Sequence, residues 1–191
     1  MKARWTRPVL WAILAMLLVS GCTAVTDNAT GSRDKIDSPA VQTTSESPGK
    51  EVSDTVPVKV YFGSHDARQL EAEVHWLKKD DLLMQQAMKL LIKGPQNPKL
   101  WAVLPPATRV KSVSVHGRIA QVDFSDEIVK HSPGGSSREI LAVGAIVNTL
   151  TEFAAVERVQ ILVEGKKVNT LFGHVDISEP LGRSVAIIKE K

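Results

Sequence analysis

The pattern of apolar residues changes abruptly at Val56, and this change limits how much of the chain can fold. From Thr23 to about Thr55 the chain is rich in Ser, Thr, Asp, Gly and Pro, and its few apolar residues are mostly Ala and Val. Such a segment cannot bury enough surface to offset the chain entropy lost on folding. From Val56 to about Ile188 apolar residues recur without a second linker. We therefore predict a disordered tether over residues 22–55 and one compact domain over residues 56–188.

Two extended segments open the predicted domain. In residues 56–62 apolar side chains occupy every second position, which is the period of a half-buried strand. Residues 70–77 alternate in the same way, with Leu70, Ala72, Val74 and Trp76 on one face and Glu71, Glu73 and His75 on the other. We expect the two strands to pair as neighbours and the apolar face of the second strand to pack on the core.

Two longer segments have the spacing of amphipathic helices. The first is predicted over residues 81–93, with Asp80 or Asp81 as its N-cap and Gly94-Pro95 after its end. The second is predicted over residues 137–153, because Ser136 and Glu139 have the spacing of a capping box. Its apolar stripe is wide and comprises Ile140, Val143, Ile146, Val147, Leu150 and Phe153. Asn148 and Thr149 interrupt this stripe, and we expect them to anchor a neighbouring loop through hydrogen bonds.

The remaining strands are predicted in hairpins. Residues 110–115 and 119–124 flank a turn at His116-Gly117, and a short helical turn follows to about Lys130. Residues 158–163 and 168–172 flank a turn at Glu164-Gly165-Lys166. The order β-β-α-β-β-α-β-β predicts an α+β fold with two helices packed on one face of a mainly antiparallel sheet. For residues 181–188 a further strand and a frayed tail are both open.

A short leader precedes the tether. Lys2, Arg4 and Arg7 lie before an apolar run of about ten residues, which is too short to cross a bilayer core, since a spanning helix needs about 20. The run ends in Val19-Ser20-Gly21-Cys22, which resembles a lipobox of bacterial lipoproteins. The resemblance implies cleavage of a signal peptide over residues 1–21, a diacylglyceryl group on Cys22 and an extracytoplasmic protein held on the cell membrane. An uncleaved anchor helix is the alternative.

Charge and cysteine count exclude several functions. The chain has 24 basic and 21 acidic residues, and three of the basic ones lie in the leader, so the mature chain has 24 − 3 = 21 basic residues against 21 acidic ones. A nucleic-acid partner would need an excess of basic residues, so we expect no nucleic-acid partner. Cys22 is the only cysteine, so its lipidation leaves no thiol for disulfides, metal binding or catalysis.

The sequence contains no recognisable catalytic constellation. HExxH, GxSxG and GxxxxGK[ST] motifs are absent, and no two of the five histidines have the spacing of a metal pair. Asp123 and Asp126 could form a pair of carboxylates for glycoside cleavage, but a strand-end surface residue and a first-turn acid explain them more simply. We predict that the protein is not an enzyme and that it has no catalytic residues, no metal and no cofactor.

Two segments are candidate binding sites. His131, Gly134, Gly135 and Ser136 precede a helix, where free backbone N–H groups can bind an anion or a carboxylate such as that of a peptidoglycan stem peptide. The alternative is a tight turn whose N–H groups are satisfied internally. His174, Asp176 and Ser178 form a candidate docking segment, for which a turn shaped by side-chain hydrogen bonds is the alternative.

Several motifs in a fixed order cover nearly all of the predicted domain. They are Leu90–Pro95, Val122–Ser125, Pro133–Ser136, Ile146–Glu152, Val163–Gly165 and Gly173–Leu181. Through them the chain resembles the GerMN (spore germination GerM) domain. The resemblance implies an α+β ring-building-like architecture and an assembly or interaction role in sporulation, germination or the cell envelope, with an envelope protein or a second copy as partner. Peptidoglycan binding and, less favoured, cell-wall hydrolysis are the alternatives. This chain has a single copy of the domain, whereas some members of the family have two.

Overall fold

The structure is a computed structural model that describes residues 54–131 and 134–190. The predicted leader, Cys22 and the tether up to residue 53 lie outside the described residues. Within the described residues no helix is long and apolar enough to span a membrane. The first strand begins at Thr55, and the extent of the folded domain, residues 56–188, stays a prediction.

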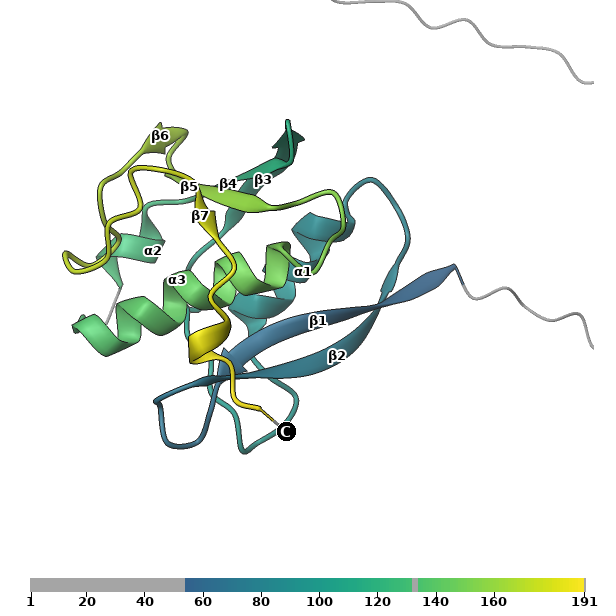
Figure 1. Cartoon of the computed structure of the whole chain (residues 1–191), viewed down its shortest axis with the longest axis horizontal. Helices are drawn as coiled ribbons and strands as arrows, with labels where there is room; N and C mark the ends of the chain where they lie inside the picture. Colours follow the sequence, from purple (N-terminus) through teal and green to yellow (C-terminus); the bar gives the residue numbers. More distant parts are fainter. Residues whose placement is uncertain (1–53, 132–133, 191) are drawn as a thin grey trace, which may run out of the picture. The chain divides into compact units, whose positions relative to one another are not determined.

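The described domain has three layers (Figure 1). A hairpin of β1 (Thr55–Gly63) and β2 (Leu70–Lys78) forms the lower layer in this view. The helices α1 (Leu83–Lys93) and α3 (Ser136–Leu150) form the middle layer. A second sheet forms the upper layer from β3 (Val110–His116), β4 (Ile119–Phe124), β5 (Arg158–Val163), β6 (Lys166–Lys167) and β7 (Leu181–Gly182). Because α3 lies between two sheets, it is buried continuously from Leu141 to Leu150.

The predicted α+β class and the order of its main elements are confirmed, but the strands form two sheets. The hairpin β1-β2 is separate from the sheet β3-β4-β5-β6, in which β7 also pairs with β5. The second sheet is mixed, since β4 and β5 are parallel and its other pairs are antiparallel. The chain between β4 and β5 passes through α2 (Glu127–Lys130) and α3, and a helical crossover of this kind joins parallel strands.

The face predicted for β2 is partly wrong. Leu70 is fully buried, yet Val74 and Trp76 on the same face are 54% and 66% exposed, whereas His75 on the opposite face is buried. The cause is the register with β1, in which His75 lies opposite Val58 and Trp76 lies opposite Pro57. The face of β2 that turns inward is therefore set by its pairing with the buried side chains of β1, and not by the alternation of apolar residues within β2.

The hairpin β3-β4 forms as predicted. Its turn residues Gly117 and Arg118 both have positive φ (54° and 67°), as a type I′ turn requires. The register shifts between Val110 and Ser112, and this bulge brings Val110 to the same core side as Val113 and Val115, although the sequence alternation separates them.

Neither helix start is capped as predicted. In α1 the Asp80 carboxylate accepts from the backbone N–H of Leu82 at 2.9 Å, but Leu82 itself is the N-cap and no side chain caps the helix. In α3 the capping box is absent, because Gly135 is the N-cap and the Glu139 carboxylate points into the domain. Ile140, predicted in the apolar stripe, is consequently 44% exposed.

The C-terminal region differs from the predictions. The return strand predicted over residues 168–172 is wrong, since after the turn the pairing with β5 is limited to Lys166–Lys167 and does not extend to residues 168–172. Residues 181–190 are neither one strand nor a frayed tail: β7 is followed by a 3₁₀ turn, Val185–Ile187, and Ile188 bridges to Leu70. This segment packs closely on α3, where a Cβ at Gly144 would overlap Ile187. The glycine in mid-helix is therefore explained by close packing.

Candidate functional site

The predicted docking segment is held from within by Glu139. Its carboxylate is fully buried and accepts hydrogen bonds from the backbone N–H groups of Leu171 (2.9 Å), Phe172 (2.7 Å) and His174 (2.6 Å). The ring Nδ1 of His174 lies 3.2 Å from the same carboxylate. Burial alone would raise the pKa of Glu139, but these N–H donors outweigh it and lower the pKa. The N–H groups that would pair in a return strand bind this carboxylate instead.

The rest of the docking segment is the predicted turn. The Asp176 carboxylate accepts from the backbone N–H of Ser178 at 2.9 Å and from its hydroxyl at 2.7 Å. These two hydrogen bonds lower the pKa of Asp176. The side chains of Asp176 and Ser178 thus bond to each other, and the docking role of His174, Asp176 and Ser178 stays a prediction.

The predicted binding loop lies at the start of α3. His131 follows α2 directly, residues 132–133 lie outside the described residues, and Gly134 and Gly135 have positive φ (71° and 94°). No atom lies within 4 Å of a Cβ placed at either glycine, so this backbone borders open space. Ser136 begins the helix without a capping side chain. The alternative, in which the side chains of Ser136 and Glu139 accept from the N–H groups at this helix start, is therefore wrong. Binding by this loop stays a prediction.

Asn148 anchors a neighbouring loop as predicted, whereas Thr149 bonds to strand β1. Asn148 donates to the carbonyl of Ser184 and accepts from its N–H, both at 2.9 Å, and Thr149 Oγ1 accepts from the N–H of Tyr61 at 3.1 Å. One turn further, Glu152 accepts from the hydroxyl of Tyr61 at 2.7 Å and pairs with Arg183. Burial first, and then the Glu152 hydrogen bond, raise the pKa of Tyr61. These side chains join α3 to β1 and to the C-terminal segment.

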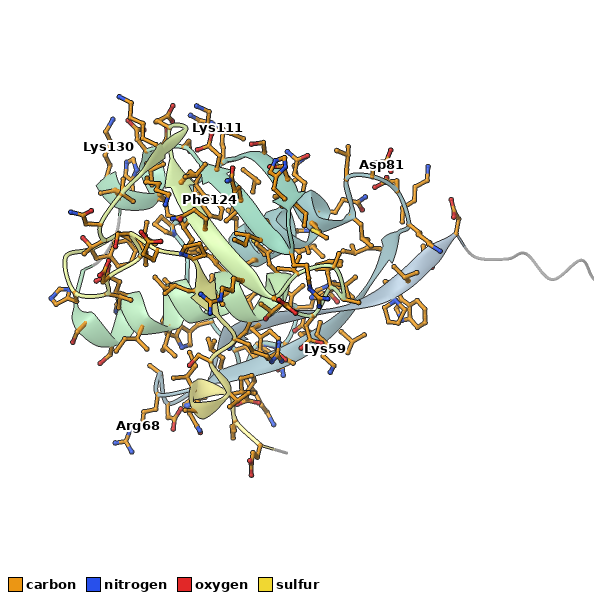
Figure 2. All side chains as sticks on the ribbon, turned by 45° about the horizontal axis from the view of Figure 1, so that its top comes forward. Lys59, Arg68, Asp81, Lys111, Phe124 and Lys130 are labelled. Atoms are coloured by element: carbon orange, nitrogen blue, oxygen red, sulfur yellow. The ribbon has the colours of Figure 1, made fainter. Side chains whose placement is uncertain are left out.

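Two further motifs meet where the strands β4 and β5 of the upper sheet end. Asp123 accepts from the N–H of Gly165 at 2.8 Å, and Glu164 accepts from the N–H of Asp126 at 3.1 Å and from Lys111 Nζ at 2.6 Å. Asp126 also pairs with Lys130, and Figure 2 shows Lys111 and Lys130 on the same side of the domain. Asp123 is buried rather than on the surface. The carboxylates of both aspartates therefore bond to other groups of the same domain. The described residues contain no group of three His, Cys, Asp or Glu side chains able to hold a metal.

The structure identifies a surface that the sequence analysis missed. At the end of the hairpin where β1 begins and β2 ends, Val74 and Trp76 are exposed beside Pro57 and Lys59, whose backbone lies opposite them in β1. We call these four residues the open hairpin end, and Figure 2 shows Lys59 within it. Two hollows of about 340 and 580 Å³ flank Lys59 and Val74.

The lining of these hollows suits contact with another macromolecule. The smaller hollow is mostly apolar and includes Phe153 and Ala154, and the larger one is bordered by Tyr61 and the C-terminal segment. Lys59 pairs with Glu152 at 3.4 Å, so a charged rim adjoins an apolar centre. An exposed aromatic side chain with aliphatic neighbours and a polar rim is typical of a protein interface. Locating this surface requires the register of β1 with β2, and that register cannot be read from the sequence.

Comparison with known proteins establishes the family. The model of the Germane family, described as "Sporulation and spore germination", matches residues 59–169, and this chain belongs to that family. No curated protein matches the chain significantly.

Three solved structures are similar to the described domain. The first GerMN domain of the sporulation protein GerM from Bacillus subtilis is 26% identical, with a TM-score of 0.59, and the match covers 68% of this chain and 98% of that domain. A "Putative Lipoprotein from Clostridium perfringens" is 27% identical, with a TM-score of 0.51, covering 69% and 89%. The tandem GerMN domains of GerM, 20% identical with a TM-score of 0.58, share the fold, and the match covers 74% of this chain and 49% of the tandem. The predicted GerMN membership is thereby confirmed.

Proposed function

We propose that this protein is a lipid-anchored, extracytoplasmic interaction module without catalytic activity, which serves sporulation, spore germination or assembly of the cell envelope. Membership of the Germane family supports the process, and Cys22 after a short apolar leader supports the anchor. The observation that carries the proposal is that polar side chains of the family motifs, such as Asp123 and Asn148, bond to the protein's own backbone. Motif residues used in this way hold the fold, and their polar groups are occupied by hydrogen bonds within the domain.

The open hairpin end is the surface through which we propose that an envelope protein is bound. Trp76 and Val74 would form the buried centre of the interface, and the charged pair of Lys59 and Glu152 would lie at its rim. A large aromatic side chain loses little conformational entropy when it is buried, so it contributes strongly to such contacts.

Site-specific photo-cross-linking in the native host tests this proposal. A photoreactive residue replaces Val74 in the full chain, so that Trp76 is retained, and a second variant carries it in place of Lys166, which is also exposed and lies on β6. We expect one envelope protein to be joined at position 74 and not at position 166. Adducts of the chain with itself would show self-assembly as the contact, and no specific adduct at position 74 under sporulating and vegetative conditions would contradict the proposal.

The anchor and the absence of catalysis are tested separately. Replacing Cys22 by Ala should release the protein from the membrane fraction, and retention unchanged from the wild type would contradict lipidation. Prolonged incubation of the purified protein with cell-wall sacculi should leave the muropeptides unchanged. Co-sedimentation with sacculi beyond that of a lipid-free control protein would instead favour the peptidoglycan-binding alternative.

A further inference from the structure

Two hollows lie between α1 and β3. One hollow of about 390 Å³ is lined by Lys89, Ile92 and Lys93 of α1 and by Thr108, Arg109 and Val110 at the start of β3. A second of about 340 Å³ is lined by residues 80–85 at the start of α1, by Val113–Val115 of β3 and by Phe153. Because the same two elements line both hollows, we treat them as one groove, along which α1 and β3 run in opposite directions.

The strand that borders this groove is the edge of its sheet. β3 pairs with β4 alone, so one side of it has no neighbouring strand. His116 and Ile119 flank the two-residue turn and therefore form a hydrogen-bonded pair of the ladder. By the alternation of an antiparallel ladder, the backbone groups of Val113 and Val115 point away from β4. Within the described residues, neither backbone makes a hydrogen bond outside the β3-β4 ladder. An open edge of this kind is a template for a further strand.

The two ends of the groove carry opposite charge. Lys89, Lys93 and Arg109 border one end, and neither lysine forms an ion pair within the described part of the chain. Arg109 pairs with Glu127 at 2.9 Å. Asp80 and Asp81 border the other end, where Leu82 is 56% exposed. Figure 2 shows Asp81 on the loop before α1. Between the two ends the lining is apolar, with Ile92, Val110, Val113 and Val115.

We propose that this groove binds an extended peptide segment of a protein partner, which adds to β3 as an antiparallel strand. Charge complementarity defines the segment: basic residues near its N-terminus lie over Asp80 and Asp81, apolar residues occupy the middle, and acidic residues near its C-terminus lie over Lys89 and Lys93. Antiparallel addition is chosen because it is the more stable pairing per residue. Main-chain hydrogen bonds to Val113 and Val115 supply affinity, and the charged ends set direction and register. This groove and the open hairpin end rest on different observations, so either proposal can fail alone.

A synthetic peptide tests the groove with the full chain purified in detergent. The probe is a fluorescent peptide of sequence Lys-Lys-Val-Thr-Val-Thr-Val-Glu-Glu, and binding is followed by fluorescence anisotropy. We expect the double variant Lys89→Glu/Lys93→Glu to weaken binding at least ten-fold. The variant Lys166→Glu/Lys167→Glu, which changes the net charge equally on β6, should weaken it less than two-fold. Equal affinities for the two double variants, or no binding of the probe at 1 mM peptide, would overturn the proposal.

Two further measurements separate strand addition from simple charge attraction. A probe with N-methyl groups on alternate amides cannot pair with β3 and should bind at least ten-fold more weakly than the parent. A probe with its C-terminal Glu-Glu replaced by Lys-Lys should recover affinity for Lys89→Glu/Lys93→Glu. Hydrogen exchange at the amides of Val113 and Val115 should slow when the parent probe is bound. Equal binding of the N-methylated probe, or unchanged exchange at these two amides, would show that the peptide does not add to β3.

Discussion

The helix α3 and the open hairpin end use their residues in opposite ways. On α3 and in the loop that it holds, polar side chains are buried, and Glu139 and Asn148 each bond two or more backbone groups of distant segments. At the hairpin, apolar side chains are outside, with Trp76 66% exposed. Buried polar side chains thus hold the layers together, whereas at the hairpin apolar side chains remain exposed. This contrast suggests that function should be tested at the exposed surface and stability at the buried polar residues.

A large effect is expected from removing the buried carboxylate of Glu139. Glu139→Ala leaves the N–H groups of Leu171, Phe172 and His174 without their acceptor, and we expect a loss of about 3 kcal/mol in the free energy of unfolding. Urea denaturation measures it. Glu157→Ala removes an exposed pair with Arg118 and should cost less than about 0.5 kcal/mol. Equal losses in the two variants would contradict the distinction between buried polar residues and surface residues.

A difference of similar size is expected between two residues of the same hairpin. Phe62 is fully buried and Trp76 is mostly exposed. Phe62→Ala should cost about 3–5 kcal/mol by creating a cavity, whereas Trp76→Ala should change stability by no more than about 0.5 kcal/mol. In the cross-linking experiment Trp76→Ala, combined with the photoreactive residue at position 74, should abolish the adduct. A strongly destabilised Trp76→Ala would show that this side chain packs on the fold rather than on a partner.

A smaller effect is expected from pH. The pKa of Glu139 in the folded protein is lower than its ordinary value of 4.5, because backbone N–H groups donate to the ionised form. Its ionisation therefore stabilises the fold above about pH 4.5, and this stability is lost as pH falls through the lowered pKa. Thermal unfolding from pH 3 to pH 7 should show the wild type converging with Glu139→Gln below pH 4.5. A gap between the two melting temperatures that stays constant with pH would contradict the assignment.

Local patterns in the sequence predicted the elements well. The alternation in residues 56–62, the helical spacing in residues 81–93 and the β3-β4 hairpin all correspond to elements of the structure. The loop-anchoring role of Asn148 is also confirmed, and Thr149 too has a hydrogen-bond partner, because a polar residue in a buried helix must find one. These features depend on neighbours within a few residues, so the sequence displays them directly.

The errors have a common origin in contacts between distant segments. Ser136 and Glu139 have the spacing of a capping box, but a carboxylate that receives three N–H groups from residues 171–174 is better satisfied than one that receives a single N–H at its own helix start. The same contacts remove the predicted strand over residues 168–172. The face of β2 was misjudged because its register with β1 overrides its own alternation.

The sequence alone determined the α+β class of the domain and its family, and it supplied the predictions of the domain's extent and of the lipid site. Each of these follows from composition, local periodicity or ordered motifs, which a chain carries whatever its fold. Only the tertiary structure decided that the strands form two sheets around the helices, that Glu139 is buried, and that Trp76 and the α1–β3 groove face outward. The physical reason is that burial and strand edges are settled by which segments pair across the fold, and pairing partners dozens of residues apart leave little trace in either segment.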